Sequence, residues 1–315
     1  CSSDLEDSFV SWKSLIESSN YSGELQMKKK KQFKEYDTET LKKIQQVELE
    51  ILKDFMDICD RHGLTYFGIA GTGIGALRHQ GFIPWDDDID VAMPRDDFEK
   101  LLRLVEEEMG DKYLIMNTEH YPNYPLMTTR LTMRGTKFKE EALKDIDAPM
   151  GIFLDLYPLD KVSNNQSEAR KQARDAWFWS KILILRGIPF PMVGCSGWKK
   201  KMIHAVCGLA HLVLKICHVP KMWIYKKAYE AETRYNHYEN TERLDFFCDT
   251  TPYMNLYYTK EIYPLKKLPF EDTELNFPHD IHRNLKAMYG DYMQLPPEEK
   301  RKNHYPYELE FEGDN

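Results

Sequence analysis

Cysteine is scarce in this sequence and is not arranged as a metal-binding or disulfide framework. Six of the 315 residues are cysteines, and no two of them form a Cys-x-x-Cys motif. The pattern therefore lacks the spacing of a zinc ribbon and the cysteine density of small secreted domains. The sequence also lacks a clear secretory leader, so we expect a protein of the reducing cytoplasm.

Positive charge is in the minority. The chain has 43 Lys and Arg against 51 Asp and Glu, which gives a formal net charge of −8. Because binding to a nucleic-acid backbone requires clustered Lys and Arg, we expect no nucleic acid among the partners. Basic residues gather only locally, notably at Lys28–Lys31 and Trp198–Lys201.

A long hydrophobic run without polar residues is also missing. Met202–Val219 comes closest, but it contains four ionisable residues: His204, His211, Lys215 and His218. These residues argue against a membrane-spanning helix. A helix packed in the core is the favoured interpretation. The alternative is a helix on the inner membrane face, led by Trp198 and three lysines, which would give a peripheral membrane contact.

The same segment has a possible metal-binding pattern, since His204, Cys207, His211 and His218 fall on one face of the expected helix. Ligands drawn from one straight helix cannot readily surround a tetrahedral ion. We therefore do not assign a zinc site here.

The length exceeds the usual size of one domain, so we expect a catalytic core with an extension. The predicted boundaries are an N-terminal extension at 1–35, a core at 36–165 and a mainly helical part at 166–315. The first 26 residues precede Met27 and are rich in Ser, Glu and Asp. They could be a native extension, a tag remnant or an upstream misreading.

Hydrophobic periodicity predicts an α+β fold with a small mixed sheet flanked by helices. A helix should begin at the N-cap Asp37 and end at Gly63, and a second should cover 98–109. Further helices are expected over 167–240, with breaks near 187–197 and at Pro220, and over 280–289. Strands are expected at 64–70, 88–91, 113–117, 126–133 and 152–157, with a strand-like stretch at 268–277.

The sequence Asp86-Asp87-Asp88-Ile89-Asp90-Val91 gives the strongest indication of chemistry. Asp88 and Asp90 should lie near the end of a strand, where side chains two apart share a face with Cα atoms roughly 6.6 Å apart. Two carboxylates placed this way can bind one hard cation or bridge a pair of cations. The alternative is an acidic turn in which one aspartate caps a helix and the others are solvated.

A glycine-rich turn precedes the aspartates. Gly71 and Thr72 follow a β-rich run, so they should lie where a strand leads into a helix. Backbone N–H groups and a hydroxyl at such a turn can face phosphate. No Gly-Lys-Ser/Thr follows, and the glycine spacing does not fit a dinucleotide-binding fingerprint. Alone the glycine-rich turn is weak evidence for phosphate binding, because tight packing explains most such turns. Together with Asp-x-Asp on the next strand, it becomes a specific indication.

Residues 64–102, with GTGIGALRHQGFIPWDDDIDVAMPRDDFEKLL at their centre, resemble the LicD family of phosphocholine and polyol-phosphate transferases. The stretches GIFLDLYPLD at 151–160 and MYGDYM at 288–293 carry the resemblance further. It implies a nucleotidyltransferase-like core related to the fukutin-type proteins. One departure stands out: the family usually has Gly-Gly-Thr at the turn, whereas here Ala70 precedes Gly71 and Thr72.

The resemblance also implies a third acidic residue on a neighbouring strand, and Asp155 fits. A charge inside a buried strand is costly unless it is paired or metal-bound, so a salt bridge to a buried arginine is the alternative. Asp160 lies beyond Pro158 and is interpreted as a turn residue with a capping role.

Four further residues are candidates around the donor. Arg78 could neutralise phosphate, although surface solvation is its alternative, and His79 has an indirect or exposed role. Trp85 could line the pocket or belong to the core. Arg130 could bind phosphate or pair with an aspartate.

The resemblance implies a metal-dependent transferase with catalytic and metal-binding Asp88, Asp90 and Asp155, and with Mg²⁺ or alternatively Mn²⁺ as cofactor. The donor would be a CDP-activated alcohol, CDP-choline being favoured, and CMP would be released. The acceptor would be a hydroxyl on a glycan, teichoic-acid-like or lipid-linked precursor of the cell surface. Nucleotidyl transfer with release of pyrophosphate and an inactive nucleotide- or glycan-binding module remain the alternatives.

Overall fold

The computed structural model describes residues 34–301 and 303–313, so the expectations for the first 26 residues lie outside the described part. Its helices are α2 (Thr38–His62), α3 (Ala70–His79), α4 (Arg95–Glu108), α5 (Gln166–Gly187), α6 (Gly197–Ile216), α7 (Lys221–Glu232), α8 (Thr259–Ile262) and α9 (Ile281–Tyr289). Its strands are β1 (Phe67–Gly68), β2 (Asp90–Pro94), β3 (Tyr113–Met116), β4 (Thr129–Met133), β5 (Lys137–Glu140), β6 (Phe153–Lys161), β7 (Arg243–Asp245), β8 (Tyr257–Tyr258), β9 (Lys266–Phe270), β10 (Thr273–Phe277) and β11 (Pro306–Glu310). The predicted α+β class is confirmed.

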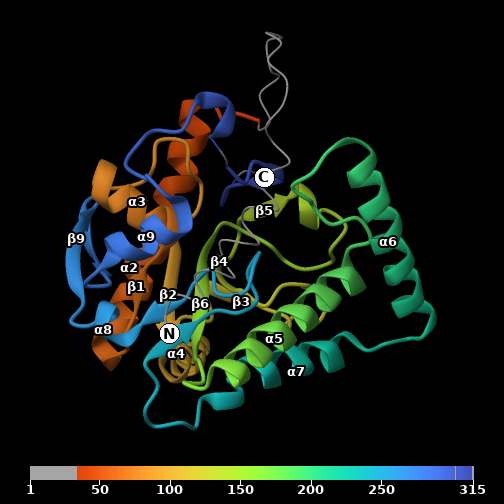
Figure 1. Ribbon diagram of the computed structural model, residues 1–315. Helices are drawn as coiled ribbons and strands as arrows, with labels where there is room; N and C mark the ends of the chain where they lie inside the picture. The colour runs from red at the N-terminus through yellow and green to blue at the C-terminus, as the bar shows by residue number, and fades with distance from the viewer. Residues whose placement is uncertain (1–33, 302, 314–315) are drawn as a thin grey trace.

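One mixed sheet organises the fold. Its strands follow the order β1-β2-β6-β4-β3, and β7 and β8 extend it from β6. The β2–β6 pair is parallel, whereas the β1–β2, β4–β6 and β3–β4 pairs are antiparallel. In Figure 1, α2, α3, α9 and β9 lie to one side of this sheet and α5, α6 and α7 to the other. The sheet thus separates two groups of helices.

Helix α2 follows the sequence prediction closely. The side chain of Asp37 accepts a hydrogen bond from the backbone N–H of Thr40 at 2.9 Å, which satisfies one of the free donors of the first turn. Gly63 ends the helix with φ 62°, a left-handed conformation that glycine adopts without a Cβ clash. The apolar face, including Ile44, Ile51 and Phe55, is fully buried against the sheet.

Two strand predictions need correction. The strand expected at 152–157 continues to Lys161, so Asp160 lies inside β6 and not in a turn. Pro158 is tolerated there because β4 pairs with β6 only up to Leu156 and β7 only from Asp160, so no neighbouring strand requires an N–H at that edge. The aspartate strand begins at Asp90, so the acidic run leads into β2 and does not end a strand.

The C-terminal part returns to the core. The strand-like stretch expected at 268–277 is a hairpin of two strands, β9 and β10, and α9 follows it as expected. They contribute Phe270, Leu275 and Leu285 to the same core cluster as α2. Strand β11 pairs with β5, which the sequence did not indicate. This pairing brings the residues just before β11 back to the acidic run.

Helices α5, α6 and α7 match the predicted helical segment and its two breaks. Helix α5 packs on both α6 and α7. The favoured expectation that Met202–Val219 packs in the core is wrong, because no residue of α6 is buried. No single described helix is long and apolar enough to cross a membrane; α6 and the α7 region meet those criteria only together, as a pair bent by 113°.

Candidate active site

Three carboxylates converge at the centre of the sheet. Oxygen atoms of Asp88, Asp90 and Asp155 all lie within 4.8 Å of one another. Asp90 opens β2 and lies directly opposite Asp155 in the parallel β2–β6 register, so both side chains project from the same face. Asp88 joins them from the preceding segment. The structure therefore brings together the three acidic residues that the sequence singled out.

Asp155 also has the arginine partner that was its alternative interpretation. Arg130 is its neighbour across the β4–β6 pair and donates from Nε to Asp155 Oδ1 at 3.0 Å. The same guanidinium donates from Nη1 to Glu140 Oε2 at 2.7 Å and lies 3.7 Å from the ring centroid of Phe153. Arg130 is thus an aspartate partner, and it fixes one oxygen of a carboxylate that still belongs to the acidic group.

The acidic group holds more negative charge than the protein around it neutralises. Burial raises the pKa of Asp88 to about 6, with Asp87 and Asp155 adding to the shift and His304 opposing it. Burial also raises the pKa of Asp90 well above its usual value, again with Asp88 and Asp155 contributing. The Oδ1 atom of Asp90 is buried without a hydrogen-bond partner. A buried carboxylate oxygen with no partner is one that a bound cation would satisfy.

The donor set suits a hard divalent cation. All ligands available at Asp88, Asp90 and Asp155 are carboxylate oxygens, which Mg²⁺ and Mn²⁺ prefer over sulfur and imidazole. These three residues would hold the ion.

A second group, Asp87, Asp88 and His304, lies beside the first. Asp87 is fully buried and accepts hydrogen bonds from the Tyr36 hydroxyl at 2.5 Å and from the backbone N–H of His304 at 2.8 Å. His304 Nδ1 lies 3.3 Å from Asp88 Oδ2. Although burial opposes it, the charges of Asp88 and Asp87 raise the pKa of His304 well above its usual value. A protonated His304 therefore offsets part of the acidic charge.

Glu48 completes this surrounding from α2. It is 1% exposed, and neither of its carboxyl oxygens has a hydrogen-bond partner. Burial raises the pKa of Glu48 well above its usual value, with Asp87 and Asp88 adding to the shift. The neutral form of this carboxyl is favoured, because an additional negative charge beside Asp87 and Asp88 would be uncompensated.

The glycine turn supports the aspartates directly. Thr72 Oγ1 accepts a hydrogen bond from the backbone N–H of Asp90 at 2.8 Å, which ties α3 to the start of β2. A Cβ on Gly71 would come within 2.9 Å of Asp86 Oδ2, so glycine allows this carboxylate to approach the first turn of α3. Ala70 has φ 46°, the left-handed conformation that glycine favours. The departure from Gly-Gly-Thr thus falls at a position where glycine would be less strained.

Arg78 and Trp85 are not part of the carboxylate group. Arg78 lies in the last turn of α3, where Nη1 donates to the carbonyl of Tyr292 at 2.7 Å and Nε donates to Nε2 of His79 at 2.9 Å. Trp85 is half-buried, and the Arg301 guanidinium lies 4.4 Å from its ring centroid. Arg78 thus connects α3 to the C-terminal part of the chain, and Trp85 connects the residue just before the acidic run to it.

A cavity of about 200 Å³ adjoins the carboxylates through Tyr157. Tyr157 is two residues beyond Asp155 on β6 and therefore shares its face. A hydrogen bond from Tyr157 favours the ionised form of Asp90. The ring of Tyr157 meets that of Phe246 edge-on with centroids 5.3 Å apart, and Lys181 and Met127 line the same cavity.

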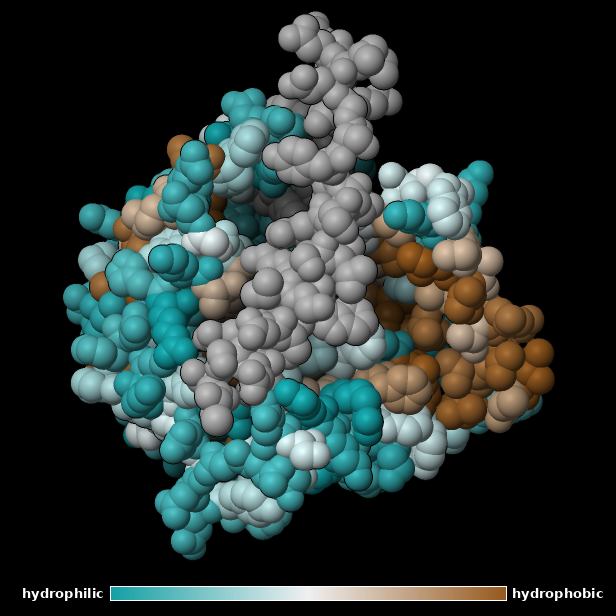
Figure 2. All heavy atoms as spheres, viewed as in Figure 1, coloured by the Kyte–Doolittle hydropathy of each residue, from teal (hydrophilic) through white to brown (hydrophobic). Residues whose placement is uncertain are grey.

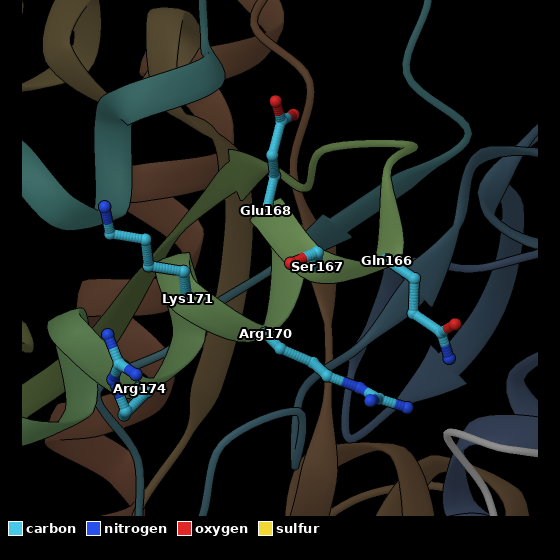
Figure 3. A pocket seen from close by; sticks show the side chains of 6 residues that line it. All are labelled: Gln166, Ser167, Glu168, Arg170, Lys171 and Arg174. Carbon is cyan, nitrogen blue, oxygen red and sulfur yellow. The ribbon is translucent and has the colours of Figure 1, made fainter.

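A second hollow, shown in Figure 3, lies at the start of α5 and is unrelated to the carboxylates. It is lined by polar and charged side chains from α5 alone: Gln166, Ser167, Glu168, Arg170, Lys171 and Arg174. Those side chains diverge from the helix in the figure and do not meet at a common point. We assign it no role.

Asp160 has a structural role. The residue is fully buried and accepts two hydrogen bonds from Arg95, Nε to Oδ1 at 2.9 Å and Nη2 to Oδ2 at 2.5 Å. Glu232 lies on the same guanidinium, 3.5 Å from Nη2. The expectation that Asp160 caps a turn is therefore wrong, since it forms a buried ion pair that joins β6 to α4.

Residues 63–182 match the LicD/FKTN/FKRP nucleotidyltransferase domain family. These residues form a LicD-family domain. The segment contains the glycine turn, the acidic run and β6, so it includes every side chain of the three-carboxylate group. The family that the sequence motifs indicated is confirmed for this segment, and the predicted fold class agrees with it.

The chain is also similar to a named relative along most of its length, both inside and outside this domain. It is 28% identical over 274 residues to the lipopolysaccharide cholinephosphotransferase LicD of Haemophilus influenzae, covering 84% of this chain and 96% of the relative. It is also 38% identical over 48 residues to an uncharacterized protein of Rickettsia prowazekii, covering 15% of this chain and 18% of that protein. The first similarity extends well beyond the LicD-family domain.

Three residues around the LicD-family site did not emerge from the sequence. Glu48 could have been found from the sequence, because it is a charged residue on the apolar face of the expected helix, between Ile44 and Ile51. His304 could not have been found from the sequence, since it reaches Asp88 only through the pairing of β11 with β5. Tyr157 stood inside a recognised strand, but only the β2–β6 register shows that it lies beside the carboxylates.

Proposed function

We propose that this protein transfers phosphocholine, or a related alcohol phosphate, from a CDP-activated donor to a hydroxyl of a cell-surface glycan or its precursor, releasing CMP. The observation that carries the proposal is the group Asp88, Asp90 and Asp155 within a LicD-family domain. That the chain is a transferase rests on the family and on the similarity to a cholinephosphotransferase. The CDP donor, the Mg²⁺ or Mn²⁺ cofactor and a cytoplasmic location belong to the proposal.

The acidic residues have separate tasks in this reaction. Asp88, Asp90 and Asp155 would hold the divalent ion, which when bound neutralises the donor diphosphate and makes its phosphorus more electrophilic. Arg130 holds Oδ1 of Asp155 and thereby orients the carboxylate. We assign to Asp155 the proton of the attacking hydroxyl, because its burial raises the pKa of this carboxyl and makes it a better base.

The transfer is a single displacement at phosphorus. The acceptor oxygen forms a bond to the phosphorus that bears the alcohol, its proton passes to Asp155, and the bond to CMP breaks with its electron pair leaving on CMP. Attack at the other phosphorus would instead transfer the nucleotidyl group. Pyrophosphate release from a nucleoside triphosphate would mark that alternative.

We place the transferred alcohol in the cavity beside Tyr157. The cavity is lined by the Tyr157–Phe246 aromatic pair, Tyr157 lies two residues beyond Asp155 on β6, and a volume of about 200 Å³ suits a small group better than a whole nucleotide. Burial lowers the pKa of Lys181, whose Nζ donates to the carbonyls of Cys248 and Asp249. Because the Lys181 ammonium would repel a quaternary ammonium, Lys181→Met is expected to lower the KM for CDP-choline and to leave the affinity for Mn²⁺ unchanged.

A donor screen tests the proposal. Purified protein with Mg²⁺ and a glycan acceptor is given CDP-choline, CDP-ethanolamine, CDP-ribitol, CDP-glycerol or, for the nucleotidyl-transfer alternative, CTP, and CMP and pyrophosphate are both quantified. The expected result is CMP release with one donor strongly preferred. Donor binding that is independent of Mg²⁺, without turnover of any donor, would instead indicate an inactive binding module.

A further inference from the structure

Helix α6 has its apolar face turned outward. Its large apolar side chains recur every three or four residues and are each more than half exposed: Trp198, Met202, Val206, Leu209, Leu212, Val213 and Ile216. In a helix that packs on a protein core this stripe would face inward. Figure 2 shows the result as a brown area on the side of the molecule where α6 lies.

The two histidines of α6 face the protein instead. His204 is within hydrogen-bond distance of the carbonyl of Pro191, at 3.1 Å, and His211 of the carbonyl of Leu185, at 2.7 Å. These contacts fix the rotation of α6 about its axis, so the outward direction of the apolar stripe is a feature of the folded helix. They also leave the two histidines outside both carboxyl-containing groups that could hold a metal among the described residues.

The apolar area continues onto the neighbouring segments. Phe190 and Met192, in the connection between α5 and α6, are 59% and 78% exposed. Trp223 on α7 is 47% exposed and packs edge-on against Trp179 of α5. An exposed apolar area of this kind marks an interaction surface, and tryptophans at its edge suit the boundary between water and lipid.

Charge decides which partner this surface fits. Residues 176–229 contain nine Lys and Arg and no Asp or Glu, whereas the remainder of the chain has 34 Lys and Arg against 51 Asp and Glu. Lys199, Lys200 and Lys201 form the first turn of α6 and are exposed. Two copies of the chain meeting through this face would bring two cationic segments together. An anionic surface would instead be attracted to the cationic residues of this segment.

We propose that α6, with the α5–α6 connection and Trp223, is a docking surface for an anionic lipid bilayer. The helix lies in the plane of the interface, inserts the stripe from Trp198 to Ile216 shallowly and places its lysines at the lipid phosphates. The proposal depends on neither the transfer reaction nor the metal, and its test needs no activity.

The test is co-sedimentation of the full chain with vesicles of equal parts phosphatidylglycerol and phosphatidylcholine, against vesicles of phosphatidylcholine alone. Wild type is expected to sediment with the anionic vesicles at low salt. Changing Lys199, Lys200 and Lys201 to Glu should weaken binding by at least about a hundredfold, from about fivefold per lysine removed with the added carboxylates repelling the lipid. The double variant Leu209→Gln/Val213→Gln should also weaken it at least about tenfold.

A matched control uses apolar residues that are equally exposed elsewhere. Met293 and Leu295 are 50% and 53% exposed, against 63% and 51% for Leu209 and Val213, and lie outside α5–α7. Met293→Gln/Leu295→Gln should bind vesicles as wild type does. Quenching of tryptophan fluorescence by bromine-labelled acyl chains should fall in Trp198→Phe, since Trp198 would insert.

Three results would overturn the proposal. Wild type that stays in the supernatant at low salt is the first. Equal loss of binding in the control and in Leu209→Gln/Val213→Gln is the second, because it would show that the effect is not specific to α6. The third is a wild-type dimer, seen by analytical ultracentrifugation, that Leu209→Gln/Val213→Gln dissociates; the surface would then bind a second copy.

Discussion

Arg130 Nε lies 3.0 Å from Asp155 Oδ1, so a carboxylate of the candidate metal site is at the same time half of a buried ion pair. The arginine also pairs with Glu140 at 2.7 Å. One guanidinium thus pairs with two carboxylates, so the negative charge of Asp155 and Glu140 is only partly neutralised beside Asp88 and Asp90.

This sharing predicts different outcomes for the two partners. Arg130→Met leaves two buried carboxylates without a cation and should lower the free energy of unfolding by about 3–5 kcal/mol. Asp155→Asn leaves Arg130 paired with Glu140 and should cost no more than about 2 kcal/mol, while abolishing metal binding. Urea unfolding and Mn²⁺ titration of both variants check this. A large stability loss in Asp155→Asn with normal Mn²⁺ affinity would make Asp155 purely structural.

Asp160 provides the contrasting case. Asp160→Asn breaks the bidentate pair with Arg95 in a fully buried site and should destabilise the protein by about 3–5 kcal/mol. It touches neither Asp90 nor Asp155, so kcat measured well below the melting temperature should stay normal. Activity lost in proportion to that of Asp155→Asn, at a temperature where the variant is folded, would contradict the assignment.

Glu232 predicts a pH dependence of stability. Burial raises the pKa of Glu232 to about 8, with Arg95 opposing and Asp160 adding to the shift. The folded state holds this proton, whereas the unfolded state, with a pKa near 4.5, releases it. Protonation of Glu232 therefore contributes fully to the free energy of unfolding below pH 4.5, and this contribution is lost as pH rises towards 8.

The Glu232→Gln variant removes this titration. Relative to wild type it should become more stable as pH rises from 5 to 8.5, by on the order of a few kcal/mol. Guanidinium unfolding of both proteins across that range measures the difference. A stability difference that stays constant with pH would mean that Glu232 is ionised in the folded protein.

Ala70 predicts a stabilising substitution at the glycine turn. A left-handed φ costs an alanine about 1–2 kcal/mol, against about 0.5–1 kcal/mol of added chain entropy for glycine. Ala70→Gly should therefore raise the free energy of unfolding by up to about 1 kcal/mol. Ala76→Gly, in the interior of the same helix, is the control and should lower it by a similar amount. Equal destabilisation by both would show that Ala70 is unstrained.

The sequence predicted those parts of the fold that local patterns determine. Asp37 and Gly63 are caps recognisable from residue type, and the apolar spacing between them specifies the helix. Asp160 was misplaced because Pro158 is typical of a strand end, yet its strand runs on beside β2. The outward rotation of α6 was invisible, since an apolar stripe has the same spacing whether it faces a core or a membrane.

The candidate site divides in the same way. Asp88 and Asp90 are close in sequence, so their side chains could be expected to meet; Asp155 followed from family resemblance. His304 and Tyr157 depend on strand pairings between distant segments. Such pairings are fixed by tertiary packing, and a single sequence carries little trace of them.

The most direct test of the account is CMP release from the preferred CDP-activated donor by wild type and by Asp90→Asn, each at saturating Mg²⁺ and donor. Asp90 has an unpartnered buried oxygen and lies opposite Asp155, so its loss should reduce turnover by more than about a hundredfold, beyond the 10–100-fold typical of residues behind the metal ligands. The melting temperature should be unchanged or higher, because repulsion among the carboxylates falls. Near-normal CMP release by Asp90→Asn would contradict the account.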